Sequence, residues 1–173
     1  MIEANLTQVS DHVYWMPPSD PHYPSLCAVV GSQQTLMLDA GADAAHAQRF
    51  LSALAAKGLP PPVYVALTHW HFDHIMGASI ADVPVIAHKD TAAKIAALAL
   101  YDLGNPQHTQ RKAVGDHVAN SAEYIQDQLS DPQGARLTQP SLIVHDRFEL
   151  RLGGVTCQIQ YVGGDHAADS CVI

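Results

Sequence analysis

The pattern of hydrophobic and polar positions predicts a mixed α/β chain in which short strands accompany one long helix. Apolar and β-branched runs bounded by turn residues are typical of strands, and the helix expected over 42–57 ends at Gly58, shortly before three prolines. Eight strands are expected, over 12–16, 26–30, 35–38, 63–67, 83–87, 141–145, 148–152 and 155–162. The last three read as a meander with a turn at Gly153 and Gly154.

Residues 90–131 are expected to be helical and are the most individual part of the chain. Apolar residues recur at the spacing of an amphipathic helix, at Val114, Val118, Ala122, Ile125 and Leu129. We interpret this segment as a helical insertion. It forms either a helical pair that covers the sheet or a lid or dimer contact above a functional site.

The hexapeptide 69–74, His-Trp-His-Phe-Asp-His, follows an apolar strand and holds three imidazoles and one carboxylate. These groups are nitrogen and oxygen ligands that zinc, iron and manganese accept. A single histidine beside a strand is usually structural, but four such groups between apolar segments would lose hydration without compensation. The hexapeptide therefore predicts a metal site.

The hexapeptide resembles the signature of the metallo-β-lactamase superfamily, His-x-His-x-Asp-His in a loop after a strand. Residues 36–41 resemble the family's strand that ends in Asp-x-Gly, and residues 163–170 resemble the segment that brings a third histidine to the first metal. The three motifs occur in the family's order. The resemblance implies an α/β (α+β) fold, a metallo-β-lactamase-like αβ/βα sandwich.

The resemblance also assigns roles to individual residues. Metal site one would be formed by His69, His71 and His166, and metal site two by Asp73 and His74, with a bridging water. A water bound to such a metal has a pKa of roughly 7, which makes hydroxide available at neutral pH. Asp73 would be catalytic, because it would orient this nucleophile and accept its proton.

Three further residues are candidates for supporting roles. Asp39 is a candidate for accepting a hydrogen bond from a ligating imidazole and so supporting the metal site, or it makes an Asx turn at the strand end. His22 and Tyr23 lie in a proline-rich loop that corresponds to a hairpin overhanging the family's active site. They are candidate substrate contacts, or part of a surface turn.

The family's remaining ligands for site two follow the third-ligand segment, whereas this chain stops at Ile173. We therefore expect residues 1–173 to form a single metallo-β-lactamase-like domain that is incomplete at its C-terminus, with only the first half of the sandwich and the start of the second. The rest would be cleaved, or supplied by another chain, and a natural short form is the alternative. An uncovered sheet face would favour association with that C-terminal part or with a second copy.

Composition narrows the class of partner. A net charge of −8 with nine Lys and Arg argues against nucleic-acid binding. The sequence has no apolar run long enough for a membrane span and no secretory signal, so a cytoplasmic location is expected. Three cysteines without paired spacing are expected to be free thiols, and Cys171 is expected to be a core residue rather than a neighbour of the metals.

These observations favour a metal-dependent hydrolase acting on a small-molecule ester, thioester, lactone or amide. The cofactor would be zinc, two ions in a complete site, although iron and manganese accept the same ligands. The rival enzyme class is a mononuclear iron dioxygenase of the same fold that oxidises a sulfur substrate. The third interpretation is a catalytically silent, metal-binding truncated form.

Overall fold

The computed structural model describes residues 5–19, 22–101, 103 and 136–173. Seven strands form the larger sheet, in the order in which they occur along the chain. They are β1 (Thr7–Gln8), β2 (Val13–Met16), β3 (Leu26–Val30), β4 (Thr35–Leu38), β5 (Pro62–Ala66), β6 (Val85–His88) and β7 (Leu142–Val144). Strands β1 to β4 pair antiparallel, and β4 to β7 pair parallel. The parallel strands therefore end at the same edge of the sheet, and the loop after β5 begins there.

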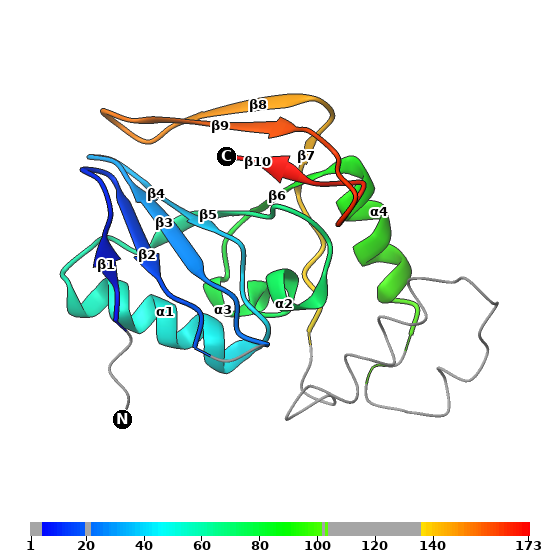
Figure 1. Cartoon of the computed structure of the whole chain (residues 1–173), viewed down its shortest axis with the longest axis horizontal. Coiled ribbons are helices and arrows are strands. Elements are labelled where there is room, and N and C mark those ends of the chain that lie inside the picture. Colours follow the sequence, from blue (N-terminus) through cyan, green and yellow to red (C-terminus); the bar gives the residue numbers. More distant parts are fainter. Residues whose placement is uncertain (1–4, 20–21, 102, 104–135) are drawn as a thin grey trace.

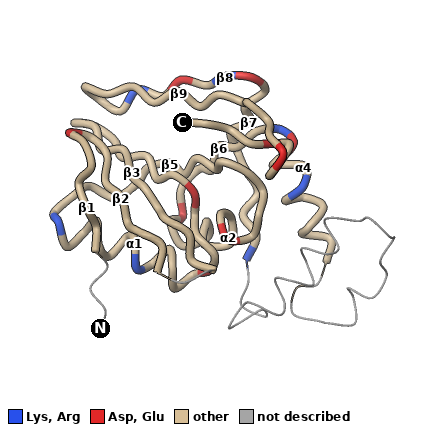
Figure 2. The backbone as a smooth tube through the Cα atoms, in the orientation of Figure 1, with Lys and Arg blue, Asp and Glu red and all other residues tan. Residues whose placement is uncertain are grey.

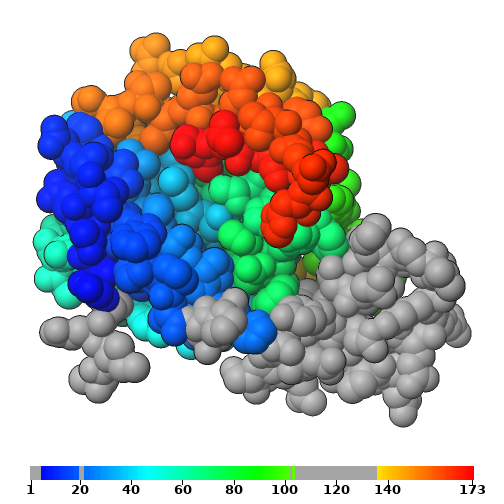
Figure 3. Space-filling view, in the orientation of Figure 1, coloured from blue at the N-terminus to red at the C-terminus, as the bar shows by residue number. Residues whose placement is uncertain are grey.

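A smaller antiparallel sheet lies against one face of the first (Figure 1). Its strands are β8 (Arg147–Arg151), β9 (Thr156–Tyr161) and β10 (Cys171–Val172), in the spatial order β10-β9-β8. In the space-filling view, β10 and the loop before it, red to orange-red, lie at the surface beside residues drawn in green (Figure 3). The C-terminal segment thus lies beside residues from the middle of the sequence.

Helices cover the other face of the seven-stranded sheet (Figure 1). They are α1 (Ala44–Ala56), α2 (Phe72–Ile75) and α3 (Ala78–Ala81), and a fourth helix, α4 (Lys89–Leu98), follows β6. Helix α1 begins at Asp43, whose side chain accepts a hydrogen bond from the backbone N–H of His46, as is typical of an N-cap. It ends just before Gly58, which has a φ of 69°, a backbone conformation that glycine adopts without a steric penalty.

Alternation of side chains along the central strands divides the core into two layers. On β4, Met37 packs among the helices whereas Leu36 packs between the two sheets. On β6, Val85 and Ala87 face the helices and Ile86 faces the second sheet. Because these strands are buried on both faces, they are mostly apolar in sequence, apart from Thr35 on β4 and His88 on β6.

The predicted fold class is confirmed, and each expected strand and the helix over 42–57 are present. The strands over 26–30 and 35–38 have the predicted ends, and the ends of the other elements differ by one or two residues. The short strand β1 and helix α3 were not anticipated. Helix α4 lies at the start of the predicted helical segment 90–131. The rest of that segment, from 102 onward except for Leu103, lies outside the described residues.

Cationic side chains are spread along the described chain (Figure 2). Lysines and arginines occur on α1, α4 and β8, in different layers of the fold. The prediction that the protein does not bind nucleic acid rests on net charge and stays a prediction. Among the helices that the structure describes, none combines the length and apolar character needed to cross a membrane.

Gly31, directly after β3, lies against the backbone of Leu152, directly after β8, and provides a test of the packing. The carbonyl oxygen of Leu152 accepts hydrogen bonds from the backbone N–H groups of Gln33 and Gln34, both at 3.0 Å, and a Cβ at Gly31 would overlap that oxygen. We expect Gly31→Ala to lower the free energy of unfolding by about 2 kcal/mol or more, because the backbone of β8 must shift. Urea denaturation measures this change. The neighbouring exposed substitution Ser32→Ala serves as the control and should stay within about 0.5 kcal/mol of wild type. An equal effect of the two would show that the contact is not close-packed.

Candidate metal centre

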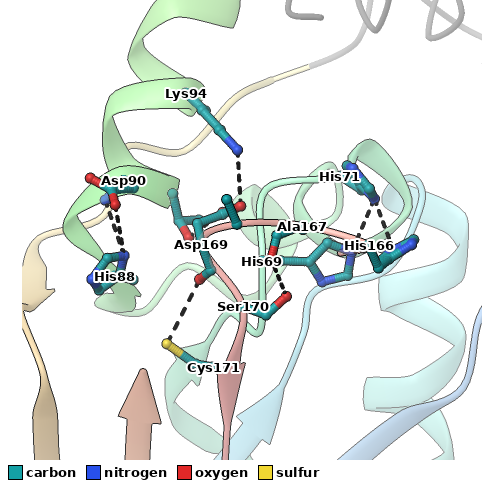
Figure 4. Close-up of polar contacts among 12 residues, drawn as sticks. His69, His71, His88, Asp90, Lys94, His166, Ala167, Asp169, Ser170 and Cys171 are labelled. Carbon is teal, nitrogen blue, oxygen red and sulfur yellow. Dashed lines mark hydrogen bonds and ion pairs between the residues drawn. The ribbon is translucent and has the colours of Figure 1, made fainter. Parts of the chain in front are cut away.

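The loop after β5 places two of the predicted ligands. Leu67 still bonds to β6, through its N–H to the carbonyl of Ile86, and the chain then leaves the sheet at Thr68. His71 has extended backbone angles and directly precedes helix α2, which begins at Phe72. This extended stretch between strand and helix allows alternate side chains, those of His69 and His71, to point the same way (Figure 4).

His166 arrives from the loop between β9 and β10, far away in sequence, and completes a triangle of imidazole nitrogens. The Nε2 atom of His69 lies 3.2 Å from His71 Nδ1 and 3.2 Å from His166 Nε2, and the last two atoms are 3.1 Å apart. Among the described residues, these three histidines are the one group of three or more possible ligands in close reach of one another.

The triangle fits a cation. Tetrahedral zinc with Zn–N bonds of about 2.0 to 2.1 Å separates its nitrogen ligands by about 3.3 to 3.4 Å, close to the observed spacing. Three neutral imidazoles can supply at most three N–H donors and need their remaining lone pairs satisfied, which a shared cation does. The donor set and spacing both match a three-histidine metal site.

The protonation of these histidines also suits metal binding. Burial, helped by the neighbouring His74, lowers the pKa of His69 to about 4. Burial and the neighbouring His166 also lower the pKa of His71. Since only a neutral imidazole has a lone pair for a metal, the lowered pKa values of His69 and His71 favour the form of these two side chains that can bind a metal.

Asp39 forms hydrogen bonds to the segment that follows β5. Its backbone φ is 58°, in the left-handed region, and its side chain is buried. The carboxylate accepts hydrogen bonds from the backbone N–H of Thr68 at 2.7 Å and from the Thr68 hydroxyl at 2.9 and 3.0 Å. It also lies 2.8 Å from His74 Nδ1. Asp39 is thus bonded to both Thr68 and His74, which lie on either side of His69 and His71 in the sequence.

This network determines which ring nitrogens face the cluster. The Thr68 hydroxyl has one proton, which it donates to Asp39, so it accepts a bond from His69 Nδ1–H at 2.9 Å. The lone pair of His69 is then on Nε2, the atom in the triangle. In the same way, donation from His74 Nδ1 to Asp39 leaves His74 Nε2 available.

Asp73 and His74 form a pair beside the triangle. His74 Nε2 is 3.5 Å from Asp73 Oδ2, and the His74 ring centroid is 4.2 Å from that of His69. Burial by itself lowers the pKa of His74, but the hydrogen bond to Asp39 and the charges of Asp39 and Asp73 outweigh it, so that the pKa is raised. The predicted residues of site two therefore lie next to those of site one, at the start of α2.

The two predicted substrate contacts are both half-buried. The Tyr23 ring stacks on His46 at 4.7 Å, and its hydroxyl donates a hydrogen bond to Asp43 at 2.6 Å. The guanidinium of Arg49 lies 5.1 Å from the ring centroid. Tyr23 is thus fixed to the first turns of α1, and the roles of His22 and Tyr23 in substrate contact stay predictions.

The structure identifies further residues around the histidine cluster that the sequence did not predict. Thr68 bonds to both Asp39 and His69, and the buried Asp169 forms an ion pair with the partly exposed Lys94. Asp169 lies in the segment 163–170, but its partner Lys94 is 75 residues away in sequence, so no local pattern reveals the pair.

The cysteines are free thiols, as predicted. Cys171 packs in the core between the two sheets, and its thiol lies 3.9 Å from the carbonyl oxygen of Asp169. Burial, together with the charge of Asp169, raises the pKa of Cys171 to about 11, so the thiol is protonated at neutral pH. A protonated core thiol is inert rather than a metal ligand.

Two sheets with outer helices and a three-histidine cluster at a strand end define a class of metal-binding α/β sandwich proteins. Within it, the family model of the metallo-beta-lactamase superfamily matches residues 21–173, and the chain belongs to that superfamily. No curated protein matches the sequence significantly.

Solved structures of the family share the fold. A motif mutant of the metallo-beta-lactamase from Cronobacter sakazakii is 19% identical to this chain, with a TM-score of 0.66. The match covers 96% of this chain and 57% of the Cronobacter chain. The metallo-beta-lactamase from Pontibacter korlensis is 18% identical with a TM-score of 0.66, covering 97% and 65%. The class B3 di-zinc enzyme from an Alaskan soil metagenome is 17% identical with a TM-score of 0.66, covering 96% and 55%. This chain thus spans between about half and two thirds of these relatives.

Proposed function

We propose that the protein is a metal-dependent hydrolase that cleaves an ester, thioester, lactone or amide bond in a small molecule. The observation that carries the proposal is the triangle formed by the ring nitrogens of His69, His71 and His166, with sides of 3.1 to 3.2 Å. Membership of the metallo-beta-lactamase superfamily and a di-zinc relative support zinc as the metal. His69, His71 and His166 would hold a divalent cation, and its chemistry when bound would be to activate a water as nucleophile at neutral pH and to polarise the substrate's carbonyl.

The chain's own residues divide the remaining work. The Asp73 carboxylate is partly exposed and lies 3.5 Å from His74 Nε2, and it can orient a water and accept its proton. Asp39 holds His74 Nδ1, so that His74 Nε2 points toward Asp73 rather than turning away. The exposed edge of His166 leaves one side of the cluster open to a substrate.

The test is metal analysis combined with turnover. Purified protein should contain zinc, and it should hydrolyse at least one member of a panel of generic esters, thioesters, lactones and β-lactam amides. Removing the metal with a chelator should lower the rate by more than about 100-fold, and added zinc should restore it. Bound iron with oxygen consumption on a persulfide would replace hydrolysis with sulfur oxidation. A fully metal-loaded protein that turns over none of the panel would favour the catalytically silent interpretation.

A further inference from the structure

Asp169 is a buried carboxylate three residues after the third histidine. Its side chain is 0% exposed, and it accepts hydrogen bonds from the Thr91 hydroxyl at 2.6 Å and from Lys94 Nζ at 3.0 Å. Both partners belong to helix α4. Burial alone would raise the pKa of Asp169, but the bonds from Thr91 and Lys94 and the charge of Lys94 lower it. The carboxylate is therefore ionised at neutral pH and joins the His166 loop to α4.

Lys94 also contacts the other ligand-bearing segment. Its ammonium lies 4.9 Å from the ring centroid of Trp70, the buried residue between His69 and His71. The Trp70 ring in turn meets the His71 imidazole edge-on, with centroids 5.3 Å apart. The Lys94 ammonium thus contacts the Asp169 carboxylate, which belongs to the loop of His166 (Figure 4), and it also lies over the ring of Trp70, between His69 and His71.

The loop that carries His166 is fixed at its base by other bonds. The N–H groups of Val162 and Gly163 donate to the carbonyl of Ser170, which closes the loop on itself. The N–H of Cys171 donates to the carbonyl of Thr68 at 2.8 Å, which joins the end of the His166 loop to the start of the segment that carries His69 and His71. The loop is therefore a closed unit, and Asp169 connects this unit to helix α4.

We propose that Lys94 and Asp169 act as a positioning pair that holds the His166 imidazole at metal-binding distance from His69 and His71. His166 is itself exposed, so its own side chain has little packing to fix it. A charge-assisted bond to the fully buried Asp169 carboxylate is directional, and it restricts the loop three residues away from His166. Helix α4 thereby sets the geometry of the three-histidine site. The inference rests on the proposed metal-dependent function.

The test is a cobalt titration of the 173-residue chain and its variants. Cobalt(II) occupies zinc sites, and its visible spectrum reports coordination geometry. Lys94→Met keeps the aliphatic stem but removes the ammonium, and Asp169→Asn keeps the shape but removes the charge. Each should weaken cobalt affinity by about 10-fold to 100-fold, the usual effect of losing a partner that orients a ligand, and should alter the spectrum. Lys94→Arg keeps the charge and the aromatic contact and should recover most of the affinity.

Folding is controlled in two ways. Circular dichroism identifies any variant that unfolds because one charge is left buried and unpaired. The double variant Lys94→Met/Asp169→Asn has no such charge, and its affinity should fall no further than that of the weaker single variant, because the two residues act together. Lys57→Met makes the same charge change at the exposed end of α1 and should bind cobalt like wild type.

The outcomes separate the two proposals. If wild type binds cobalt tightly and the folded variants bind it equally well with the same spectrum, the positioning role is wrong and the metal-dependent function stands. Equal weakening by Lys57→Met would reduce the effect to net charge and would also overturn the positioning role. If wild type itself binds no cobalt, both proposals fail.

Discussion

Replacing His166 with alanine is expected to lower zinc affinity by more than about 100-fold and to abolish hydrolysis. The substitution removes one of three ligands outright, which costs more than loss of a partner that merely orients a ligand. The free energy of unfolding of the variant should change little, because the His166 side chain is exposed and its ring contacts are with the other two histidines. Competition with a chromophoric chelator measures the affinity, and the ester, thioester, lactone and amide panel measures turnover.

The matched control is His145→Ala. His145 is also an exposed histidine near the second sheet, and its side chain lies outside the metal cluster. It should bind zinc like wild type. If His166→Ala retained wild-type affinity, the nitrogen triangle would not be the metal site and the proposed function would lose its main support.

Replacing Asp39 with alanine is expected to destabilise the fold and the metal loop together. The change leaves the Thr68 N–H, the Thr68 hydroxyl and His74 Nδ1 without their shared acceptor. Hydrogen bonds to a charged group are worth roughly 1.5 to 3 kcal/mol each, so a loss of about 3 kcal/mol or more is expected in urea denaturation. Zinc stoichiometry should fall as well, because His74 is no longer oriented toward Asp73.

Asp82→Ala separates this network from backbone strain. Asp82 is the other described non-glycine residue with positive φ, at 50°, but it is exposed at the end of α3. Both alanine variants strain the backbone, whereas only Asp39→Ala removes buried hydrogen bonds. Asp39→Asn, which tolerates the left-handed conformation, should lower zinc stoichiometry without the strain. Equal losses of stability at the two aspartates would mean that the Asp39 carboxylate contributes nothing beyond its backbone conformation.

Much of the fold could be predicted from sequence because its signals are local. The apolar run over 63–67 and the stop at Gly58 after α1 depend on residues a few positions apart, and such signals survive in the folded chain. The clustering of ligands in 69–74 is local for the same reason. The strand ends shifted by a residue or two because pairing with neighbours, rather than propensity, decides where a ladder stops.

The supporting contacts of the candidate site could not be predicted in this way. The Asp39 carboxylate meets His74 across 35 positions, and Lys94 meets Asp169 across 75. An aspartate at a strand end has the same local pattern whether it caps a turn or braces a histidine. Which of these it does depends on what the sheet brings next to it.

The sequence by itself determined the order of strands and helices, the chemistry of the hexapeptide and the family that these motifs resemble. Only the tertiary structure decided that His166 meets His69 and His71, that the buried Asp39 carboxylate bonds to His74, and that Lys94 contacts both Asp169 and Trp70. The physical reason is that ligand types and periodicity are properties of neighbouring residues. Distances of about 3 Å between side chains far apart in sequence arise only when parallel strands and packed layers bring their ends together.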